Sequence, residues 1–466
     1  MLNTVLNMDN NRIIKNFSIK GLFGTTDISI PFEDKVKILI GENGLGKTQV
    51  LNMFYYTLTK KFDRLAEYIF DSIIIEFADN EKLHINKSDV DKLLFEHPIV
   101  KEVVKRIGIK QFLDLRNSVV HFKDLSFELR RNTNLRRKLD GLSVSTGMLI
   151  EAIEVFAYNK QDDLFSHIPK EKQRVIDKHI GEYQILYFPT YRRVEEDLRN
   201  LGYDEEQFNI NREDTRLINF GMDDVDRKFY DLTKSIERLS TEGLSNISGE
   251  VLSQLVEDGM PEMEEGFLTK IEKKDIEIIF ARAGNKIKSD QKDRIKSIVE
   301  TGKIQEKDKF LLYFLQKLIN IYDQQRELDS SIKIFRDICN KYLVNKEVVY
   351  DESSIEIYIR LNDSTDKLQL NKLSSGEKQI ISIFSKIYLA PPDCNFIVLF
   401  DEPELSLSIF WQKELLPDIF NSGKCQFLLA VTHSPFIFEN TLDKYAIGLS
   451  QYIKSNHQPI KESTLL

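Results

Sequence analysis

The sequence is poor in the residues and runs that mark several large classes of protein. It has 3 cysteines, Cys339, Cys394 and Cys425, and their spacing fits no metal-binding motif. We therefore expect buried free thiols in a reducing cytoplasm. No apolar run reaches the length of a membrane-spanning helix, and the N-terminus lacks the charged-then-apolar pattern of a signal peptide. These absences predict a cytoplasmic protein with no membrane partner.

Positive charge is also in short supply. The 65 Lys and Arg residues are outnumbered by 74 Asp and Glu residues, which gives a formal net charge of −9. An acidic surface does not attract nucleic acid as a whole, so a DNA contact would need a local basic patch or a partner protein. The segment Arg130–Lys138, which contains Arg131, Arg136 and Arg137, is either such a patch or a solvated face.

Two short apolar runs in the C-terminal part of the chain end on polar residues. Phe396–Phe400 leads into Asp401 and Glu402, and Phe427–Val431 leads into Thr432–Ser434. Runs this apolar are typical of parallel strands that are covered on both faces. The carboxyl ends of such strands form the crevice in which α/β folds bind ligands. The sequence therefore predicts a ligand site at these strand ends.

The segment Gly41–Thr48, G-E-N-G-L-G-K-T, matches the P-loop pattern. It follows the strand-like segment Val36–Ile40 and precedes a helical run, which is the context that a P-loop requires. Its glycines let backbone N–H groups turn inward around phosphate oxygens at the positive end of the helix. We expect Lys47 to reach the β- and γ-phosphates of ATP and the Thr48 hydroxyl to bind Mg²⁺. Further ATP contacts are expected from Asn43, Gly44, Gly46 and Gln49.

The polar residues at the two strand ends fit the other half of a nucleotide site. Asp401 has the place of a Mg²⁺ ligand, and Glu402 has that of the residue that polarises the attacking water. His433 follows the neighbouring strand, where it would contact the γ-phosphate. Lys47, Glu402 and His433 are therefore the candidate catalytic residues, and Thr48 and Asp401 are the candidate metal ligands. Taken alone, each strand end could also be a capped strand or carry a structural histidine.

The segment Leu373–Glu377, L-S-S-G-E, resembles the signature motif of the ATP-binding-cassette (ABC) ATPases, L-S-G-G-Q. Glutamate in the last place is common in the SMC and RecF branch of that superfamily. In the family, the motif caps the γ-phosphate on the P-loop of a second subunit. The resemblance therefore implies an ATP-sandwiched homodimer or a higher assembly, with each site completed by Ser374, Ser375, Gly376 and Glu377 of the other copy. A serine at the start of a helix also suits anion binding.

The sequence lacks one residue of the family pattern, a glutamine, and does not identify the aromatic residue that would stack on adenine. The family's glutamine-bearing loop should follow the strand Ile185–Pro189, but Thr190–Arg193 reads T-Y-R-R and has no glutamine. The second contact to the Mg²⁺ shell is therefore unassigned, and the two arginines of this loop face phosphate, DNA or the acidic residues after them. Phe17 and Phe23 lie in the region where an aromatic residue would stack on adenine.

Two long insertions rich in helix signals interrupt the segments that carry the P-loop and the other predicted ATP-binding residues. In Leu311–Tyr342, apolar residues recur at alternating steps of three and four, and only Gln325 interrupts the stripe. Such spacing predicts a coiled-coil-like arm of roughly 45 Å. Phe229–Leu239 has the same spacing and is a candidate antiparallel partner. Two long helices packed in a globular helical domain are the alternative.

These patterns predict an α/β fold, an ABC-type P-loop NTPase head with a mainly parallel core sheet, an antiparallel β part and large helical insertions. The expected parts are residues 1–87 (N-terminal part of the head, with the P-loop), 88–180 (helical insertion), 181–199 (return strand and loop), 200–345 (helical insertion or arm) and 346–466 (C-terminal part of the head, with the signature, the acidic strand end and His433).

The long separation between P-loop and signature excludes a compact transporter cassette and is typical of SMC, RecF and OLD-like ATPases. Four phrases, Y-F-P-T-Y-R-R-V-E, L-S-S-G-E-K-Q-I, D-E-P-E-L-S-L-S-I-F-W-Q and T-H-S-P-F-I-F-E-N, resemble the PtuA-type ATPases of Septu and retron anti-phage defence. The resemblance implies ATP hydrolysis that restrains or licenses a separate, PtuB-like HNH nuclease. In a retron, a reverse transcriptase and its DNA–RNA product would be further partners.

Two other interpretations stay open. OLD and Gabija nucleases continue past the region of His433 into a Toprim domain, whereas this sequence ends at Leu466, so we expect no nuclease domain in the chain. A stand-alone DNA-repair ATPase of the RecF or SMC type is one alternative. The other is a scaffold locked by ATP, in which hydrolysis has little importance.

Overall fold

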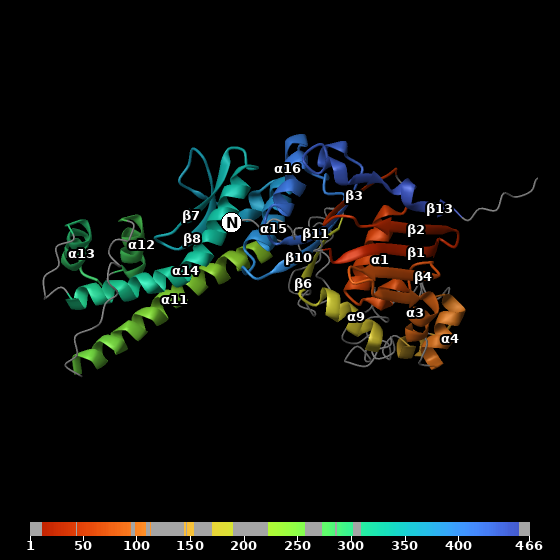
Figure 1. Cartoon of the computed structure of the whole chain (residues 1–466), viewed down its shortest axis with the longest axis horizontal. Coiled ribbons are helices and arrows are strands. Elements are labelled where there is room, and N and C mark those ends of the chain that lie inside the picture. The colour runs from red at the N-terminus through yellow and green to blue at the C-terminus, as the bar shows by residue number, and fades with distance from the viewer. Residues whose placement is uncertain are drawn as a thin grey trace, which may run out of the picture. The chain divides into compact units, whose positions relative to one another are not determined.

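The computed structural model of the chain (Figure 1) describes residues 12–42, 44–94, 98–108, 112, 144–145, 147–152, 170–189, 222–256, 273–284, 287–301 and 309–455. The chain divides into two compact units, the first from residues 1–217 and 395–466 and the second from residues 218–394. Among the helices of these ranges, none combines the length and the apolar character that a membrane crossing requires.

The first unit is built on a five-stranded parallel sheet in the order β12-β3-β11-β10-β6. Its strands are β3 (Val36–Ile40), β6 (Tyr183–Phe188), β10 (Asn395–Asp401), β11 (Cys425–Thr432) and β12 (Ala446–Gly448). β10 and β11 are buried along almost their whole length, as expected for central strands covered on both faces. The two apolar runs of the sequence are therefore neighbours in the core, as predicted.

The second sheet of this unit is antiparallel, in the order β13-β2-β1-β4-β5. Its strands are β1 (Ile14–Leu22), β2 (Thr26–Pro31), β4 (Ser72–Phe77), β5 (Lys82–Asn86) and β13 (Ile453–Ser455). Helix α1 (Lys47–Leu58) packs against both sheets, since the Phe54 ring lies 4.8 Å from that of Phe17 in β1 and 6.1 Å from that of Phe427 in β11, measured between centroids. The helix that begins at the P-loop is thus anchored on both sides.

Short helices complete the first unit. They are α2 (Phe62–Leu65), α3 (Lys87–Leu94), α4 (Pro98–Ile107), α9 (Lys170–Ile180) and α16 (Ile409–Phe420). Helix α16 connects β10 to the parallel strand β11, and its N-cap Ser408 accepts a hydrogen bond from the Trp411 N–H. Helix α16 therefore begins shortly after the carboxyl end of β10 at Asp401.

The second unit contains two long helices that lie side by side, α11 (Met222–Val256) and α14 (Lys309–Asn340) (Figure 1). Phe229 contacts Phe335 near one end of the pair, and Glu250 binds Lys317 near the other, so the two helices are antiparallel. Helices α12 (Lys273–Ala283) and α13 (Ser289–Thr301) share an apolar core with this pair. The predicted antiparallel partner is confirmed, and the pair belongs to a small helical domain.

Among its described residues, the second unit also contains a small sheet and a further helix. The sheet is antiparallel in the order β7-β8-β9, with β7 at Lys346–Asp351, β8 at Glu356–Leu361 and β9 at Lys367–Leu368. Helix α15 (Ser375–Tyr388) packs on α14, and its Phe384 ring lies 5.2 Å from Tyr342.

The predicted fold class is confirmed: an α/β P-loop fold with a parallel core sheet, antiparallel sheets and helical insertions. The three cysteines are free thiols, as expected. Cys339 and Cys425 are buried, and burial raises the pKa of Cys339 well above its usual value and that of Cys425 to about 12. Cys394 is half-buried, so the prediction of a buried thiol is only partly met there.

Candidate active site

The register of the parallel sheet brings three loops to one edge of the first unit. Ile40 at the end of β3 pairs with Thr432, and Asp401 at the end of β10 pairs with Val431. Because these neighbours all run in the same direction, the P-loop and the polar segments after β10 and β11 begin side by side. The predicted meeting of these segments at the carboxyl ends of the strands is what the structure shows.

The P-loop closes around its own lysine. Gly44 and Gly46 have φ angles of 88° and 76°, a left-handed conformation that favours glycine. A Cβ at Gly41 would lie 3.3 Å from the Lys47 Cδ, so the side chain of Lys47 passes directly over this glycine. Lys47 is only 5% exposed, and its Nζ donates to the carbonyl oxygens of Gly41 at 2.7 Å and Glu42 at 2.8 Å.

The electrostatic surroundings of Lys47 come from the strand end beside it. Burial lowers the pKa of Lys47, and the carboxylates of Glu402, Asp401 and Glu404 oppose that shift. A cation held inside a loop of inward-turning N–H groups favours a polyphosphate. The lysine is therefore positioned to meet phosphate oxygens as predicted, although this role stays a prediction.

The two candidate metal ligands contact each other. The Thr48 hydroxyl donates to the Asp401 Oδ1 at 3.0 Å across 353 residues of sequence. Asp401 is 1% exposed, whereas Thr48 is exposed at the start of α1. A hydroxyl and a carboxylate at the ends of rigid elements are the hard oxygen ligands that Mg²⁺ takes alongside phosphate oxygens. The residues present fit a Mg²⁺ ion that accompanies ATP.

Glu402 and His433 face each other beside this pair. The His433 Nε2 lies 3.7 Å from the Glu402 Oε1, and the side chains are 31% and 27% exposed, respectively. Burial raises the pKa of Glu402, with help from Asp401 and Glu404, whereas His433 and Lys47 oppose the shift. Glu402 also has a φ of 50°, an unfavourable value for a residue with a Cβ. Its Oε1 is thus a base of raised pKa within reach of a histidine.

Glu404 is a site residue to which the sequence analysis assigned no role. Its Oε1 accepts hydrogen bonds from the backbone N–H groups of His433 at 2.8 Å and Ser434 at 3.2 Å. Its Oε2 accepts from the Thr432 hydroxyl at 2.8 Å. The sequence shows that Glu404 is the third carboxylate in the short segment Asp401–Glu404. It does not show that the Glu404 side chain reaches the loop after β11.

The structure separates the two candidates for adenine stacking. Phe17 is completely buried in the core, so it cannot meet a nucleotide, and that candidate was wrong. Phe23 is 48% exposed and lies against the P-loop, since a Cβ at Gly46 would be 3.1 Å from its ring. Gln49, another predicted ATP contact, carries a buried side-chain oxygen with no hydrogen-bond partner.

The signature residues lie at the start of α15 in the second unit. Ser374 is the N-cap: its hydroxyl accepts from the Glu377 N–H at 3.4 Å, and its own N–H donates to the Glu377 carboxylate at 2.8 Å. Glu377 also binds Lys346 at 2.8 Å. Ser374 is exposed, Ser375 is half-buried, and Gly376 is buried. The Ser374 hydroxyl also donates to the Glu377 carboxylate at 2.8 Å, so the N-terminus of α15 is capped by its own glutamate.

Several predicted contacts lie outside the described residues. They are Asn43 of the P-loop, the basic segment Arg130–Lys138 and the arginine-bearing loop Thr190–Arg193. Tyr187, near the end of β6, is a described residue close to that loop in sequence. It donates to the Asn52 Oδ1 at 2.6 Å, and burial raises its pKa. The residue that would replace the family's glutamine therefore stays unassigned.

A second group of potential metal ligands lies far from this edge in sequence. Within the described ranges, Asp79, Glu81 and His179 bring one ligand atom each to within 4.8 Å of the others. However, the Lys178 ammonium already binds Asp79 at 3.0 Å and Glu81 at 2.6 Å. These pairs join α9 to the β4–β5 hairpin, and the cluster is explained as a structural contact.

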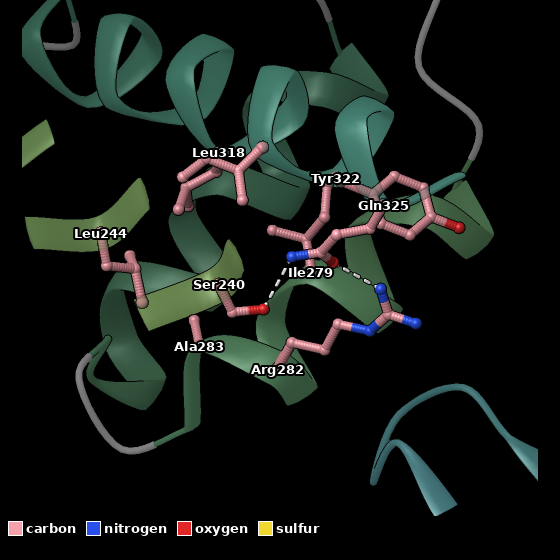
Figure 2. Close-up of a pocket in the computed structure, with 9 residues that line it drawn as sticks. Ser240, Leu244, Ile279, Arg282, Ala283, Leu318, Tyr322 and Gln325 are labelled. Atoms are coloured by element: carbon pink, nitrogen blue, oxygen red, sulfur yellow. Dashed lines mark hydrogen bonds between the residues drawn. The ribbon is translucent and has the colours of Figure 1, made fainter. Parts of the chain in front are cut away.

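The second unit contains a small cavity between α11, α12 and α14. Figure 2 shows that Ser240, Gln325 and Arg282 form its polar side, and Leu244, Ile279 and Leu318 lie around it. Gln325 donates to the Ser240 hydroxyl at 2.8 Å and accepts from Arg282 at 2.5 Å. The cavity measures about 20 Å³, which holds a water molecule rather than a nucleotide.

Comparison with known proteins places the chain in a family. The model of the AAA_15 family, described as an AAA ATPase domain, matches residues 13–438. The DNA replication and repair protein RecF of Lachnoclostridium phytofermentans is 24% identical over 192 residues, which are 38% of this chain and 52% of that protein. The chain thus spans about half the length of this curated relative.

Solved structures give a weaker likeness. A crystal structure of the Smc head bound to the C-winged helix domain of ScpA is 10% identical, with a TM-score of 0.27 over 91% of this chain and 90% of that one. The Smc head with an extended coiled coil from Pyrococcus furiosus, bound to the C-terminal domain of ScpA, is 12% identical, with a TM-score of 0.31 and the same coverage. Likeness at this level does not define a shared function.

Proposed function

The chain belongs to the AAA ATPase domain family, and on this premise we propose that it binds ATP with Mg²⁺ and hydrolyses it to ADP and phosphate. The hydrogen bond of 3.0 Å between Thr48 and Asp401 carries the proposal, because it joins the P-loop to the acidic strand end in one site. Glu402 and His433 lie at the same edge, where the γ-phosphate would be expected.

Each site residue has a chemical task in this reaction. Lys47 and the P-loop N–H groups hold the β- and γ-phosphates, and Thr48 with Asp401 would hold Mg²⁺, which supplies charge neutralisation when bound. The Glu402 carboxylate accepts a proton from the attacking water, whose oxygen bonds to the γ-phosphorus while the bond to the bridging oxygen of ADP breaks. His433 orients Glu402 and contacts the transferred phosphoryl group.

We further propose that a complete site needs two copies of the chain. Ser374 is exposed at the N-terminus of α15, where the helix dipole favours an anion, and Lys47 belongs to the other unit. Support comes from the resemblance of Leu373–Glu377 to a motif that completes a partner's site. The P-loop of one copy then meets the signature of the next.

A mixing experiment tests the paired site. Lys47→Ala and Ser374→Arg should each abolish turnover, but a mixture contains dimers in which the intact Lys47 of one copy meets the intact Ser374 of the other. In an equal mixture, about half of the dimers contain one copy of each variant, and each of these has one intact site of its two. About a quarter of the wild-type rate should therefore return. No recovery, from variants that fold and bind their partners, contradicts the paired site.

The role that the sequence resemblance favours is control of a separate HNH nuclease in anti-phage defence, within a Septu or retron system. The support is the set of four phrases quoted above. Co-expression with an HNH nuclease encoded beside this gene should give a stable complex. Infected cells that carry Glu402→Gln should then differ from wild-type cells in survival. Absence of such a gene, or of a complex, removes this proposal and leaves the ATPase intact.

Stand-alone DNA repair is the second candidate, and the match to RecF favours it. The isolated protein would then bind DNA with an affinity that falls steeply with salt, and charge reversal across Arg130–Lys138 would remove the binding. A scaffold locked by ATP would instead bind the nucleotide without measurable turnover. Binding and turnover assays on the same preparation separate the three cases.

A further inference from the structure

Glu404 lies at the point where the segment after β10 meets the segment after β11. Its carboxylate receives hydrogen bonds from three consecutive residues, the Thr432 hydroxyl at 2.8 Å and the N–H groups of His433 at 2.8 Å and Ser434 at 3.2 Å. Two N–H groups on a single carboxylate oxygen fix the direction of both peptide planes. Bonds to a charged acceptor are also stronger than neutral ones.

Gln412 of α16 binds both of these segments. Its Oε1 accepts from the Ser434 hydroxyl at 2.7 Å, and its Nε2 donates to the carbonyl oxygens of Leu407 at 3.0 Å and Glu404 at 3.4 Å. The amide therefore ties the loop after β11 to the backbone of the segment that carries Glu404. Both loops are held to one helix of the first unit.

The held loop is the one that carries His433. With its backbone N–H bound to Glu404, the His433 side chain places Nε2 at 3.7 Å from the Glu402 Oε1. The sheet ladder alone does not set this distance, because β11 ends at Thr432, one residue earlier. Beyond the strand end, the Ser434 N–H donates back to the Thr432 hydroxyl at 3.0 Å, and the bond to Glu404 fixes the His433 peptide itself.

We propose that Glu404 and Gln412 form a positioning clamp that fixes His433 against Glu402. The clamp sets the rate of the chemical step and contributes little to ATP affinity. This inference rests on the proposed ATP hydrolysis. Glu404 and Gln412 act indirectly, by holding His433 in place. This position matters for the rate, because misplacement of a reacting group by about 1 Å can lower a rate about 100-fold.

The first test needs no turnover. In the full-length protein, hydrogen exchange of the His433 amide should be about tenfold or more faster in Glu404→Ala, because this amide loses its charged acceptor. The Ser434 amide keeps the Thr432 hydroxyl, which accepts from it at 3.0 Å, so its exchange should change less. Glu404→Gln, whose amide oxygen can still accept from both N–H groups, should remain near wild type. Glu414→Ala is the matched control, since Glu414 is an exposed glutamate of α16. Unchanged exchange in Glu404→Ala overturns the clamp.

The second test separates the rate from affinity. Glu404→Ala should lower kcat about 10- to 100-fold with the Kd for ATP unchanged within about twofold, and Glu404→Gln should recover most of the rate. Gln412→Leu, which keeps the carboxylate, should lower kcat less and serves if Glu404→Ala fails to fold. A parallel loss of ATP binding, or no rescue by glutamine, overturns the clamp. A wild-type protein that binds ATP without turnover refutes the proposed hydrolysis instead, and the exchange test still decides on the clamp.

Discussion

Two polar clusters, one in each unit, use charge in opposite ways. At the strand ends of the first unit, burial lowers the pKa of Lys47, and three neighbouring carboxylates, Glu402, Asp401 and Glu404, oppose that shift. In the second unit, Arg282 donates to Asp329 at 2.8 Å, and their side chains are 4% and 1% exposed. The first cluster has more carboxylates than cations among these residues. The second pairs one cation with one anion.

The second cluster is also hydrogen-bonded by its neighbours. Arg282 donates to the Glu352 carbonyl oxygen at 2.9 Å and to Gln325 at 2.5 Å, and the Tyr350 hydroxyl donates to Asp329. These bonds tie α12 to α14 and to the segment of β7, and the buried Asp329 Oδ2 is left without a hydrogen-bond partner. Carboxylates at an accessible edge beside a P-loop are, by contrast, suited to bind a cation. The difference indicates that the first cluster is built for a ligand and the second for the fold.

The largest expected effect tests the first cluster. Glu402→Gln should lower kcat for ATP hydrolysis by about 10²- to 10⁴-fold, because the amide cannot accept the proton of the attacking water. ATP affinity should be retained, since Lys47 and Thr48 are untouched. Phosphate release and nucleotide binding measure the two quantities, with Glu414→Gln as the matched control. Turnover near the wild-type rate would mean that the carboxylate surplus does not serve hydrolysis.

The next effect tests the second cluster. Arg282→Met should lower the free energy of unfolding of the second unit by about 3–5 kcal/mol, because Asp329 would be left buried and unpaired. The double variant Arg282→Met with Asp329→Leu should recover part of that loss, whereas ATP affinity should not change in either protein.

Alkylation of two buried thiols reports on the stability of each unit separately. Cys339 lies in α14 of the second unit and Cys425 in β11 of the first, and both are at most 5% exposed. Arg282→Met should therefore speed alkylation of Cys339 and leave that of Cys425 near the wild-type rate. Equal acceleration of both thiols would show that the effect is not confined to the second unit.

The smallest effect concerns the signature helix. Burial alone would raise the pKa of Glu377, but its hydrogen bonds with Lys346 and Ser374 outweigh burial and hold the pKa below the usual value of 4.5. A depressed folded-state pKa contributes stability above the unfolded value, and that stability is lost as the pH falls through the folded value. Urea unfolding followed by circular dichroism should show a larger loss of stability below about pH 4.5 in wild type than in Glu377→Gln. The difference should stay below about 2 kcal/mol, and a pH dependence identical in both proteins would exclude this linkage.

Much of the fold followed from local pattern. The apolar runs of β10 and β11, the P-loop between β3 and α1, and the long stripe of α14 were all predicted from the sequence. Hydrophobic periodicity and glycine spacing report directly on burial and on backbone conformation, so these elements are recoverable without a structure. The end-on meeting of Thr48 and Asp401 also followed, because parallel neighbours share one carboxyl edge.

Gln325 shows the limit of this approach. In the sequence it interrupts an apolar stripe, but it is 1% exposed and hydrogen-bonded to Ser240 of α11 and Arg282 of α12. A pattern along one helix cannot reveal the polar partners that two other helices supply. Phe17 and Phe23 differ in the same way, since only the packing of β1 on α1 buries one ring and leaves the other at the P-loop.

The sequence by itself thus determined which segments become strands and helices and which residue types meet at the strand ends, because these depend on local spacing. Only the tertiary structure decided that Glu404 and Gln412 hold the loop of His433, and that Arg282 balances Asp329. Those contacts join residues 22 to 47 positions apart. Their geometry depends on sheet register and helix packing, which no single segment encodes.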